Sequence, residues 1–172
     1  FEKRIKDNTV CEVLNKVKSQ KGDVFFVAPG TVHAIGAGNI ICEVQQNSNV
    51  TYRVYDYDRK DKNGNTRPLH IQKAVDVINF QKAEKSEKSK DSKDVILASC
   101  DYFTVRKLTV DEKCEVKIDK SSFHSLIVAE GSGTLLLDGF TMDIQKGDSI
   151  FVPAQDGHYV LTGQCHIILS HI

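Results

Sequence analysis

The sequence lacks three features that would each point to a particular class of protein. Its 23 Lys and Arg residues balance 23 Asp and Glu residues, so no excess charge attracts nucleic acid or an anionic membrane. No apolar run approaches the roughly 20 residues of a membrane-spanning helix. Five cysteines lie far apart without a Cys-x-x-Cys pair, which argues against a disulfide framework or a thiolate zinc site. We expect a cytoplasmic protein with reduced thiols and no nucleic-acid or membrane partner.

What the sequence does contain is a series of short β-prone segments separated by Gly-rich turns. This pattern is typical of a β-sandwich or a β-barrel. The strands expected in the first half are 24–27, 39–44 and 50–55. Those expected in the second half are 95–100, 103–109, 113–118, 124–129, 133–138, 148–153, 158–162 and 165–170. Apolar residues three and four positions apart predict short helices within 1–18 and 69–80.

Residues 81–94 differ from the rest of the chain in composition. Nine of these 14 residues are charged, and Ala83 is the single apolar one. Such a segment buries too little apolar surface to offset the entropy lost on ordering, so we expect an exposed linker. The chain then divides into a helical lead-in (1–20), a first domain (21–80), the linker (81–94) and a second domain (95–172).

An internal repeat relates the two domains. Residues 21–33 and 146–158 align without gaps at an offset of 125 residues. Each copy runs Lys-Gly-Asp, two residues, Phe, Val, a nearby proline, and a histidine eleven residues after the glycine. These histidines are His33 and His158. Repetition at this distance predicts two copies of one domain rather than a solenoid.

Each copy resembles the second conserved motif of the cupins, which runs Gly, five residues, Pro-x-Gly, two residues, His. The resemblance implies jelly-roll barrels that often hold a metal. Only 32 residues, none of them histidine, precede His33, so the first copy is expected to be part of a barrel. The second copy has its upstream half, but His124 stands alone where a metal-binding cupin has His-x-His. The expected fold is therefore mostly β: a complete, metal-free C-terminal cupin barrel over 95–172, plus part of an N-terminal cupin barrel.

Three linked motifs, over residues 29–36, 43–48 and 51–59, resemble the C-terminal part of class I mannose-6-phosphate isomerase. The resemblance implies zinc-assisted interconversion of mannose 6-phosphate and fructose 6-phosphate, a small sugar-phosphate substrate. His33 matches a zinc ligand, Arg53 matches the catalytic arginine, and Glu43 lies near the site in the family pattern. The other zinc ligands have no counterpart in this chain, so the chain alone is expected to be inactive.

Each of these residues also has a structural interpretation. His33 could be a core histidine, Arg53 an arginine paired with Asp56, and Glu43 one partner of a strand ion pair. If residues 50–55 form a strand, the family match places Arg53 in the cavity, although the alternation of side chains would place it toward solvent. A noncatalytic sugar-binding or scaffold bicupin is the alternative function. A single-barrel phosphoglucose-isomerase-type cupin is disfavoured by the incomplete ligand set.

The remaining polar residues are expected to be structural. Arg59 and Arg67 could contact phosphate, but pairing with Asp61 in an exposed loop is expected instead. His70 is expected to cap or pack the helix of 69–80. His124 and His158 could meet inside the second barrel, but two histidines without a carboxylate make a poor metal site. We therefore expect both to serve packing.

Overall fold

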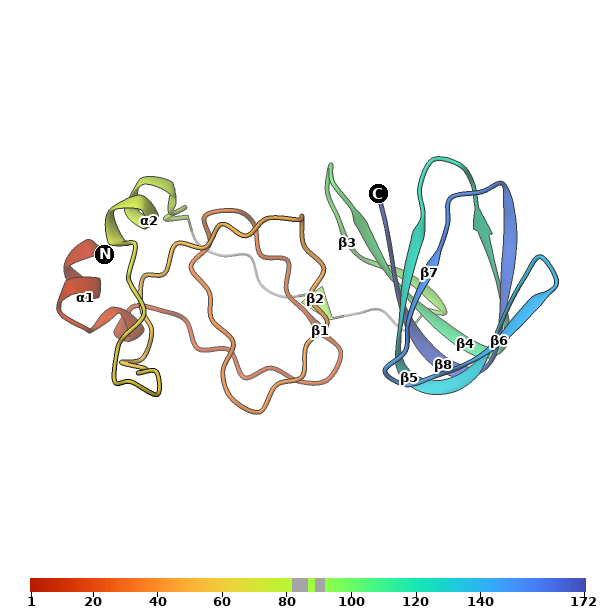
Figure 1. The fold of residues 1–172 in the computed structure, drawn as a ribbon, viewed down its shortest axis with the longest axis horizontal. Helices are drawn as coiled ribbons and strands as arrows, with labels where there is room; N and C mark the ends of the chain where they lie inside the picture. The colour runs from red at the N-terminus through yellow and green to blue at the C-terminus, as the bar shows by residue number, and fades with distance from the viewer. Residues whose placement is uncertain (82–86, 89–91) are drawn as a thin grey trace. The chain divides into compact units, whose positions relative to one another are not determined.

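The computed structural model describes residues 1–81, 87–88 and 92–172 and divides the chain into two compact units, 1–87 and 88–172 (Figure 1). Most of the expected linker lies outside the described residues. Among the residues described, no helix is both long and apolar enough to cross a membrane.

The second unit is built from antiparallel strands, as the sequence predicts. One sheet has the order β3-β4-β8-β5-β6, and β7 pairs with β5 beside β6. β8 therefore lies between β4 and β5, and its ladder with β4 runs unbroken from Thr104–His171 to Ile118–Gly157. The strands are β3 (Asp94–Ser99), β4 (Thr104–Ile118), β5 (His124–Leu137), β6 (Phe140–Gln145), β7 (Ser149–Val152) and β8 (Gly157–His171).

Three of these strands are each about twice as long as expected. The segments 103–109 and 113–118 merge into β4, and two further pairs merge into β5 and β8. Where a strand was expected to end, the chain bends and the same strand continues. Glu112, Gly131 and Gly163 adopt positive φ at these bends. Glu112 pairs with Gly163 in the β4–β8 ladder, so the bends of these two strands coincide. The sheet can thus fold over while its backbone hydrogen bonds continue.

The bent sheet encloses an apolar core. Alternate residues of β4, β5 and β8 point inward, because successive side chains of a strand face opposite sides. Among the members with no more than 1% exposure are Leu126, Val152, Tyr159, Leu161, Ile167 and Leu169. Each fully buried aliphatic side chain contributes about 1.5–3 kcal/mol by leaving water, so this core is the main source of stability in the second unit.

The expectation of a complete barrel is corrected in one respect. Figure 1 shows the sheet of the second unit curling round, but β3 forms no ladder with β6 or β7 in the part of the chain that the structure describes. β3 is a short, six-residue strand whose partner is β4, with an irregularity in register between Ile96 and Ala98. This irregularity bends the edge strand, and the barrel is left open along that edge.

The first unit contains little regular structure. Its elements are α1 (Glu2–Lys6), the 3-10 turn η1 (Val10–Glu12), β1 (Asp23–Val24) and α2 (Ile71–Val77), and β1 pairs with β2 (Glu87–Lys88). The helix expected within 69–80 is confirmed. The helix expected within 1–18 is wrong beyond Lys6, because Asn8 turns into the left-handed region and ends it. The buried apolar residues among those described in this unit are Ile5, Val10 and Ala74.

The strands expected over 24–27, 39–44 and 50–55 are not formed in the described structure, apart from the short β1. Their side chains are largely exposed: Phe26 is 54%, Ile40 103% and Val50 66% accessible. A strand is stable only when a neighbour satisfies its backbone groups, and no such neighbour occurs in the described part of this unit. These segments therefore have the composition of strands, but in the described structure they form no ladder.

The repeat detected in the sequence is reproduced in the turns. At residues 20–23, the Asp23 carboxylate accepts the backbone N–H of Gln20 at 2.8 Å, and the Asp23 N–H donates to the Gln20 carbonyl at 3.1 Å. At 145–148 the same two bonds join Asp148 and Gln145 at 2.8 and 3.0 Å. Identical residues thus form identical turns in both units.

Candidate functional site

The loop that carries His33 is held in a defined conformation. A turn is closed by the Thr31 N–H donating to the Ala28 carbonyl at 3.1 Å. The His33 ring is exposed, and its Nδ1 lies 2.9 Å from the Thr31 carbonyl oxygen. Because a carbonyl oxygen only accepts, Nδ1 carries the ring proton and Nε2 keeps its lone pair. The interpretation of His33 as a buried core residue is therefore wrong.

Gly30 fixes this loop against the end of α2. Its carbonyl accepts the backbone N–H of Asn79 at 2.9 Å. Its φ is +80°, and a Cβ placed there would lie 2.5 Å from the Val77 carbonyl oxygen and 3.0 Å from the Asn79 nitrogen. Only glycine allows the two backbones to approach this closely. The position of the His33 loop thus depends on a residue with no side chain.

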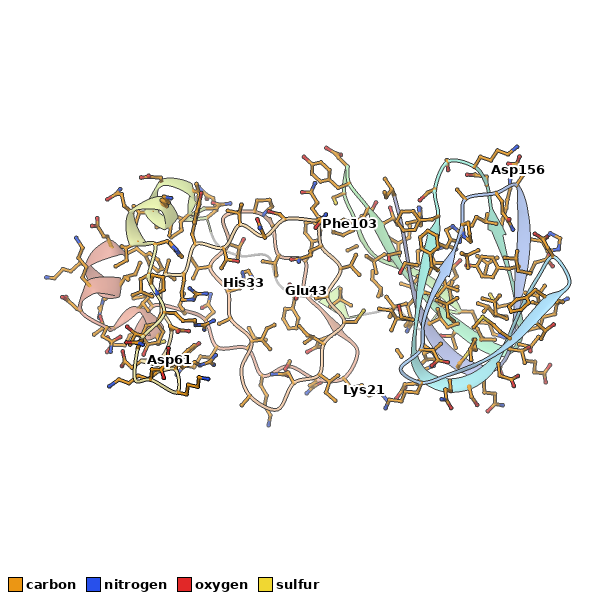
Figure 2. All side chains as sticks on the ribbon, viewed as in Figure 1. Lys21, His33, Glu43, Asp61, Phe103 and Asp156 are labelled. Atoms are coloured by element: carbon orange, nitrogen blue, oxygen red, sulfur yellow. The ribbon has the colours of Figure 1, made fainter. Side chains whose placement is uncertain are left out.

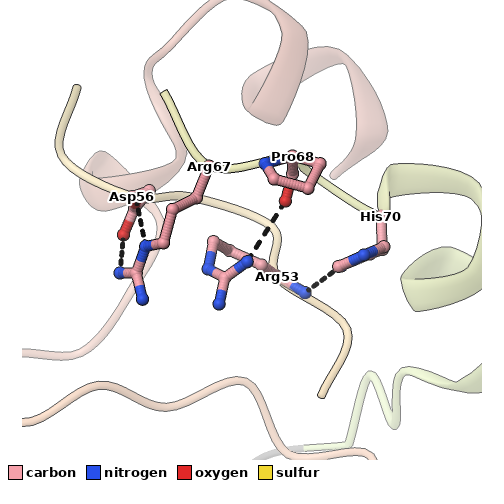
Figure 3. Close-up of polar contacts among 5 residues, drawn as sticks. All are labelled: Arg53, Asp56, Arg67, Pro68 and His70. Carbon is pink, nitrogen blue, oxygen red and sulfur yellow. Dashed lines mark hydrogen bonds and ion pairs between the residues drawn. The ribbon is translucent and has the colours of Figure 1, made fainter. Parts of the chain in front are cut away.

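Arg53 is held at the other end of the same helix (Figure 3). The His70 N–H donates to the Arg53 carbonyl at 2.7 Å, and the Arg53 N–H donates to Nδ1 of His70 at 3.1 Å. The guanidinium Nη1 donates to the Pro68 carbonyl at 3.2 Å. His70 precedes the first residue of α2 without capping it through its side chain. His70 is thus the N-cap residue of α2, as expected, but its ring binds the backbone of Arg53.

Asp56 does not pair with Arg53, contrary to the structural interpretation of that arginine. The buried Asp56 carboxylate is paired with Arg67, which donates Nε to Oδ2 at 2.8 Å and Nη2 to Oδ1 (Figure 3). Hydrogen bonding from Arg67 lowers the pKa of Asp56, so its charge persists at neutral pH. The expected Arg67–Asp61 pair is also wrong. Asp61 instead accepts the backbone N–H groups of Asn63 and Asn65 within a tight turn.

α2 therefore connects the two candidate segments. Its C-terminal end holds Gly30 through Asn79, and its N-terminal end holds Arg53 through His70. The sequence motifs did not reveal this connection. A signal for part of it was present: Asn63-Gly64 is a strong hairpin signal, and Lys60 and Thr66 pair across it. If the two chain segments that flank this turn continue side by side, residues 53–56 lie opposite residues 67–70.

Glu43 and His33 lie on irregular segments of the first unit (Figure 2). Glu43 is exposed and forms no strand ion pair with any residue that the structure describes. Within the same described ranges, no hydrogen bond or ion pair joins His33, Glu43 and Arg53 directly. Their shared role in one site thus stays a prediction. Among the described residues, hydrogen bonds hold His33 and Arg53 in place, whereas none does so for Glu43.

His124 and His158 of the second unit do not meet. His124 is buried with its Nδ1 3.0 Å from the Tyr159 hydroxyl, whereas His158 is exposed with its Nε2 3.6 Å from Glu115 Oε1. The described ranges contain no group of three His, Cys, Asp or Glu side chains that could hold a metal ion. That the second domain is free of metal stays a prediction.

Residues 93–172 match the family model described as the cupin domain of mannose-6-phosphate isomerase. An antiparallel sheet bent over an apolar core is the architecture that such a match implies. The second unit is a cupin domain, and the expectation of a mostly β cupin fold is confirmed, closure of the barrel excepted.

The similarity extends through the first unit. Over 166 residues, 94% of the chain, it is 38% identical to mannose-6-phosphate isomerase ManA of Bacillus subtilis and covers 52% of that protein. It is 35% identical over 92% of its length to a mannose-6-phosphate isomerase of Streptococcus mutans, of which it covers 51%. The crystal structure of a Bacillus subtilis mannose 6-phosphate isomerase matches 74% of this chain and 42% of that chain, with 38% identity and a TM-score of 0.65.

The chain is therefore a relative of the mannose-6-phosphate isomerases, as its motifs predict. It spans about half the length of the curated relatives it matches.

Proposed function

We propose that this chain is part of a mannose-6-phosphate isomerase, which interconverts mannose 6-phosphate and fructose 6-phosphate. The observation that carries the proposal is the extent of the similarity, which covers 94% of the chain and so takes in both units. The substrate is then a small sugar phosphate. A cytoplasmic setting belongs to the same proposal and is supported by five cysteines that are all free.

The proposed enzyme holds zinc, and His33 fits the role of one ligand. Its Nδ1–H donates to the Thr31 carbonyl, which leaves the Nε2 lone pair for a metal. Metal-binding histidines usually donate their other ring N–H in this way, because the bond fixes tautomer and orientation. A catalytic zinc needs about three protein ligands, and the described residues offer no cluster of three. We place the other ligands in the part of the relatives that this chain does not match.

Isomerisation moves a proton between two adjacent carbons, and negative charge develops on oxygen. Zinc, when bound, supplies a Lewis acid for that charge. The guanidinium of Arg53 gives one bond to Pro68, and its remaining N–H donors can stabilise the same charge. The backbone N–H and carbonyl of Arg53 are both hydrogen-bonded to His70, so little conformational entropy is lost when Arg53 acts in the reaction. Glu43 offers an exposed carboxylate for proton transfer or for contact with a zinc ligand.

A chimera tests this proposal. The half of Bacillus subtilis ManA that matches this chain is replaced by the 172 residues, and zinc content and isomerisation are measured. We expect an active, zinc-loaded chimera and an inactive isolated chain. His33→Ala should lose zinc and activity together. Arg53→Ala should keep zinc and lose about 10²–10³-fold in kcat, the usual loss when one charge-stabilising donor is removed.

Arg59→Ala is the matched control, because Arg59 is an exposed arginine of the same segment that lies 5.5 Å from the Tyr57 ring centre. It should keep the turnover of the parent chimera. Normal turnover of Arg53→Ala would reduce Arg53 to a structural residue. One tightly held zinc per isolated chain would contradict the proposed division of ligands.

A further inference from the structure

The cupin domain contains an open pocket that the proposed reaction does not use. It lies where β3, the start of β4 and the end of β8 meet, and its volume is about 510 Å³. All of its lining residues belong to the second unit: Asp94, Ile96, Ser99, Thr104, Arg106 and His171. A cavity of this size accommodates a small molecule.

The pocket wall carries hydrogen-bond donors and acceptors side by side. Arg106 is paired with Asp94 through Nε, at 3.0 Å, and through Nη2, so its Nη1 donors are not used by this pair. The hydroxyls of Ser99 and Thr104 lie 2.9 Å apart and share one hydrogen bond, which leaves each with further capacity. The Arg106 side chain is partly buried, with 27% of its surface exposed, whereas that of Asp94 is exposed at 48%.

His171 completes the polar part of the pocket wall. The ring of His171 lies 5.6 Å from that of the buried His124, which in turn is bonded to the Tyr159 hydroxyl. Burial lowers the pKa of His124 below its ordinary value of 6.5, so that ring is neutral at neutral pH. The Arg106 charge is balanced by Asp94. On the outer side, Ile96 presents an apolar surface that is 64% exposed.

We propose that this pocket binds a neutral, polyhydroxylated molecule of monosaccharide size. Each hydroxyl of such a ligand both donates and accepts, which matches the alternating groups of the wall. The C–H face of a sugar ring can pack on Ile96. An anion would be a poor ligand, because the paired donors of Arg106 already hold Asp94 and that carboxylate would repel it.

The test is a titration of the isotope-labelled 172-residue chain with mannose, followed by amide NMR. Saturable shifts centred on Ser99, Thr104 and His171 are expected. The double variant Ser99→Ala/Thr104→Val keeps the shape of the wall and should weaken binding about tenfold or more, because the ligand loses two partners. Arg106→Met, which removes the remaining donors, should weaken it further.

A control variant on the same strand tests whether the effect is confined to this pocket. Lys117→Gln, which alters the other end of β4, should leave mannose binding unchanged. Shifts that do not saturate, or that centre on the first unit, would overturn the proposal. Tenfold tighter binding of mannose 6-phosphate or inorganic phosphate at the same amides would also overturn it, since the pocket would then be an anion site. Either result leaves the isomerase proposal untouched, because that rests on the chimera.

Discussion

Residues 20–23 and 145–148 share the sequence Gln-Lys-Gly-Asp and form the same turn, yet the chain takes a different course after each turn. After Asp148 the chain enters β7, which pairs with β5. After Asp23 the strand ends at Val24. The repeat partners Val27 and Val152 have the same aligned position, but Val27 is 43% exposed and Val152 is 1% exposed. The turn is therefore a local property of four residues, whereas the strand is a property of its neighbours.

The same comparison explains a difference in sequence between the copies. Gly30 of the first copy aligns with Gln155 of the second. The loop of Gly30 is pressed against the end of α2, where no Cβ fits. Gln155 instead uses its side chain, whose amide donates to Asp138 at 3.1 Å. In the first copy, the absence of a side chain at this position allows the histidine loop to contact the helix.

The largest effect is expected from giving that loop a side chain. In the chimera, Gly30→Ala should lower kcat/KM about 10²-fold, because the clash with α2 displaces the His33 loop by the order of an ångström. Gly38→Ala is the matched control, since Gly38 has φ +82° and open space around a Cβ. Both variants carry the same left-handed strain, so the difference between them isolates the contact with α2. Equal activity of the two would show that this contact does not position the loop.

A smaller effect is expected from truncating the aligned valines. Val152→Ala should lower the free energy of unfolding of the cupin domain by about 2 kcal/mol, through lost burial and a cavity. Val27→Ala should change it by less than about 0.5 kcal/mol, as exposed substitutions generally do. Urea unfolding followed by circular dichroism measures both. A large loss for Val27→Ala would mean that the first unit buries this side chain in solution.

The smallest effect concerns the pH dependence of stability. Burial lowers the pKa of His124 in the folded chain, so the unfolded chain takes up this proton more readily. The stability of the cupin domain is then complete above pH 6.5 and falls as the pH drops from there toward the folded-state pKa. His124→Gln should flatten the dependence of the urea midpoint on pH between about 7.5 and 5.5. An unchanged pH dependence of the urea midpoint in His124→Gln would contradict this account.

Sequence patterns predicted the strands of the second unit except β6, because each of these strands carries its own β-prone run, whereas no strand was expected over Phe140–Gln145. They missed the bends, since a residue such as Glu112 at positive φ looks like the end of a strand when only local composition is considered. His33 and Arg53 were singled out by their motifs, and their role in a site stays a prediction. The contact of His70 with Arg53 was missed because it joins residues 17 positions apart through a closed loop, and no periodicity encodes such a contact.

The central position of β8 has a consequence for how the chain is made. β8 is the last strand in the chain, yet it lies between β4 and β5 and forms the longest ladders of the sheet. During synthesis, β4 and β5 leave the ribosome before β8, which lies between them in the sheet. Their apolar faces stay exposed to solvent until β8 emerges. The cupin core can close only after residues 157–171 have emerged. We therefore expect this domain to fold late and in one step, with chaperones protecting it until then.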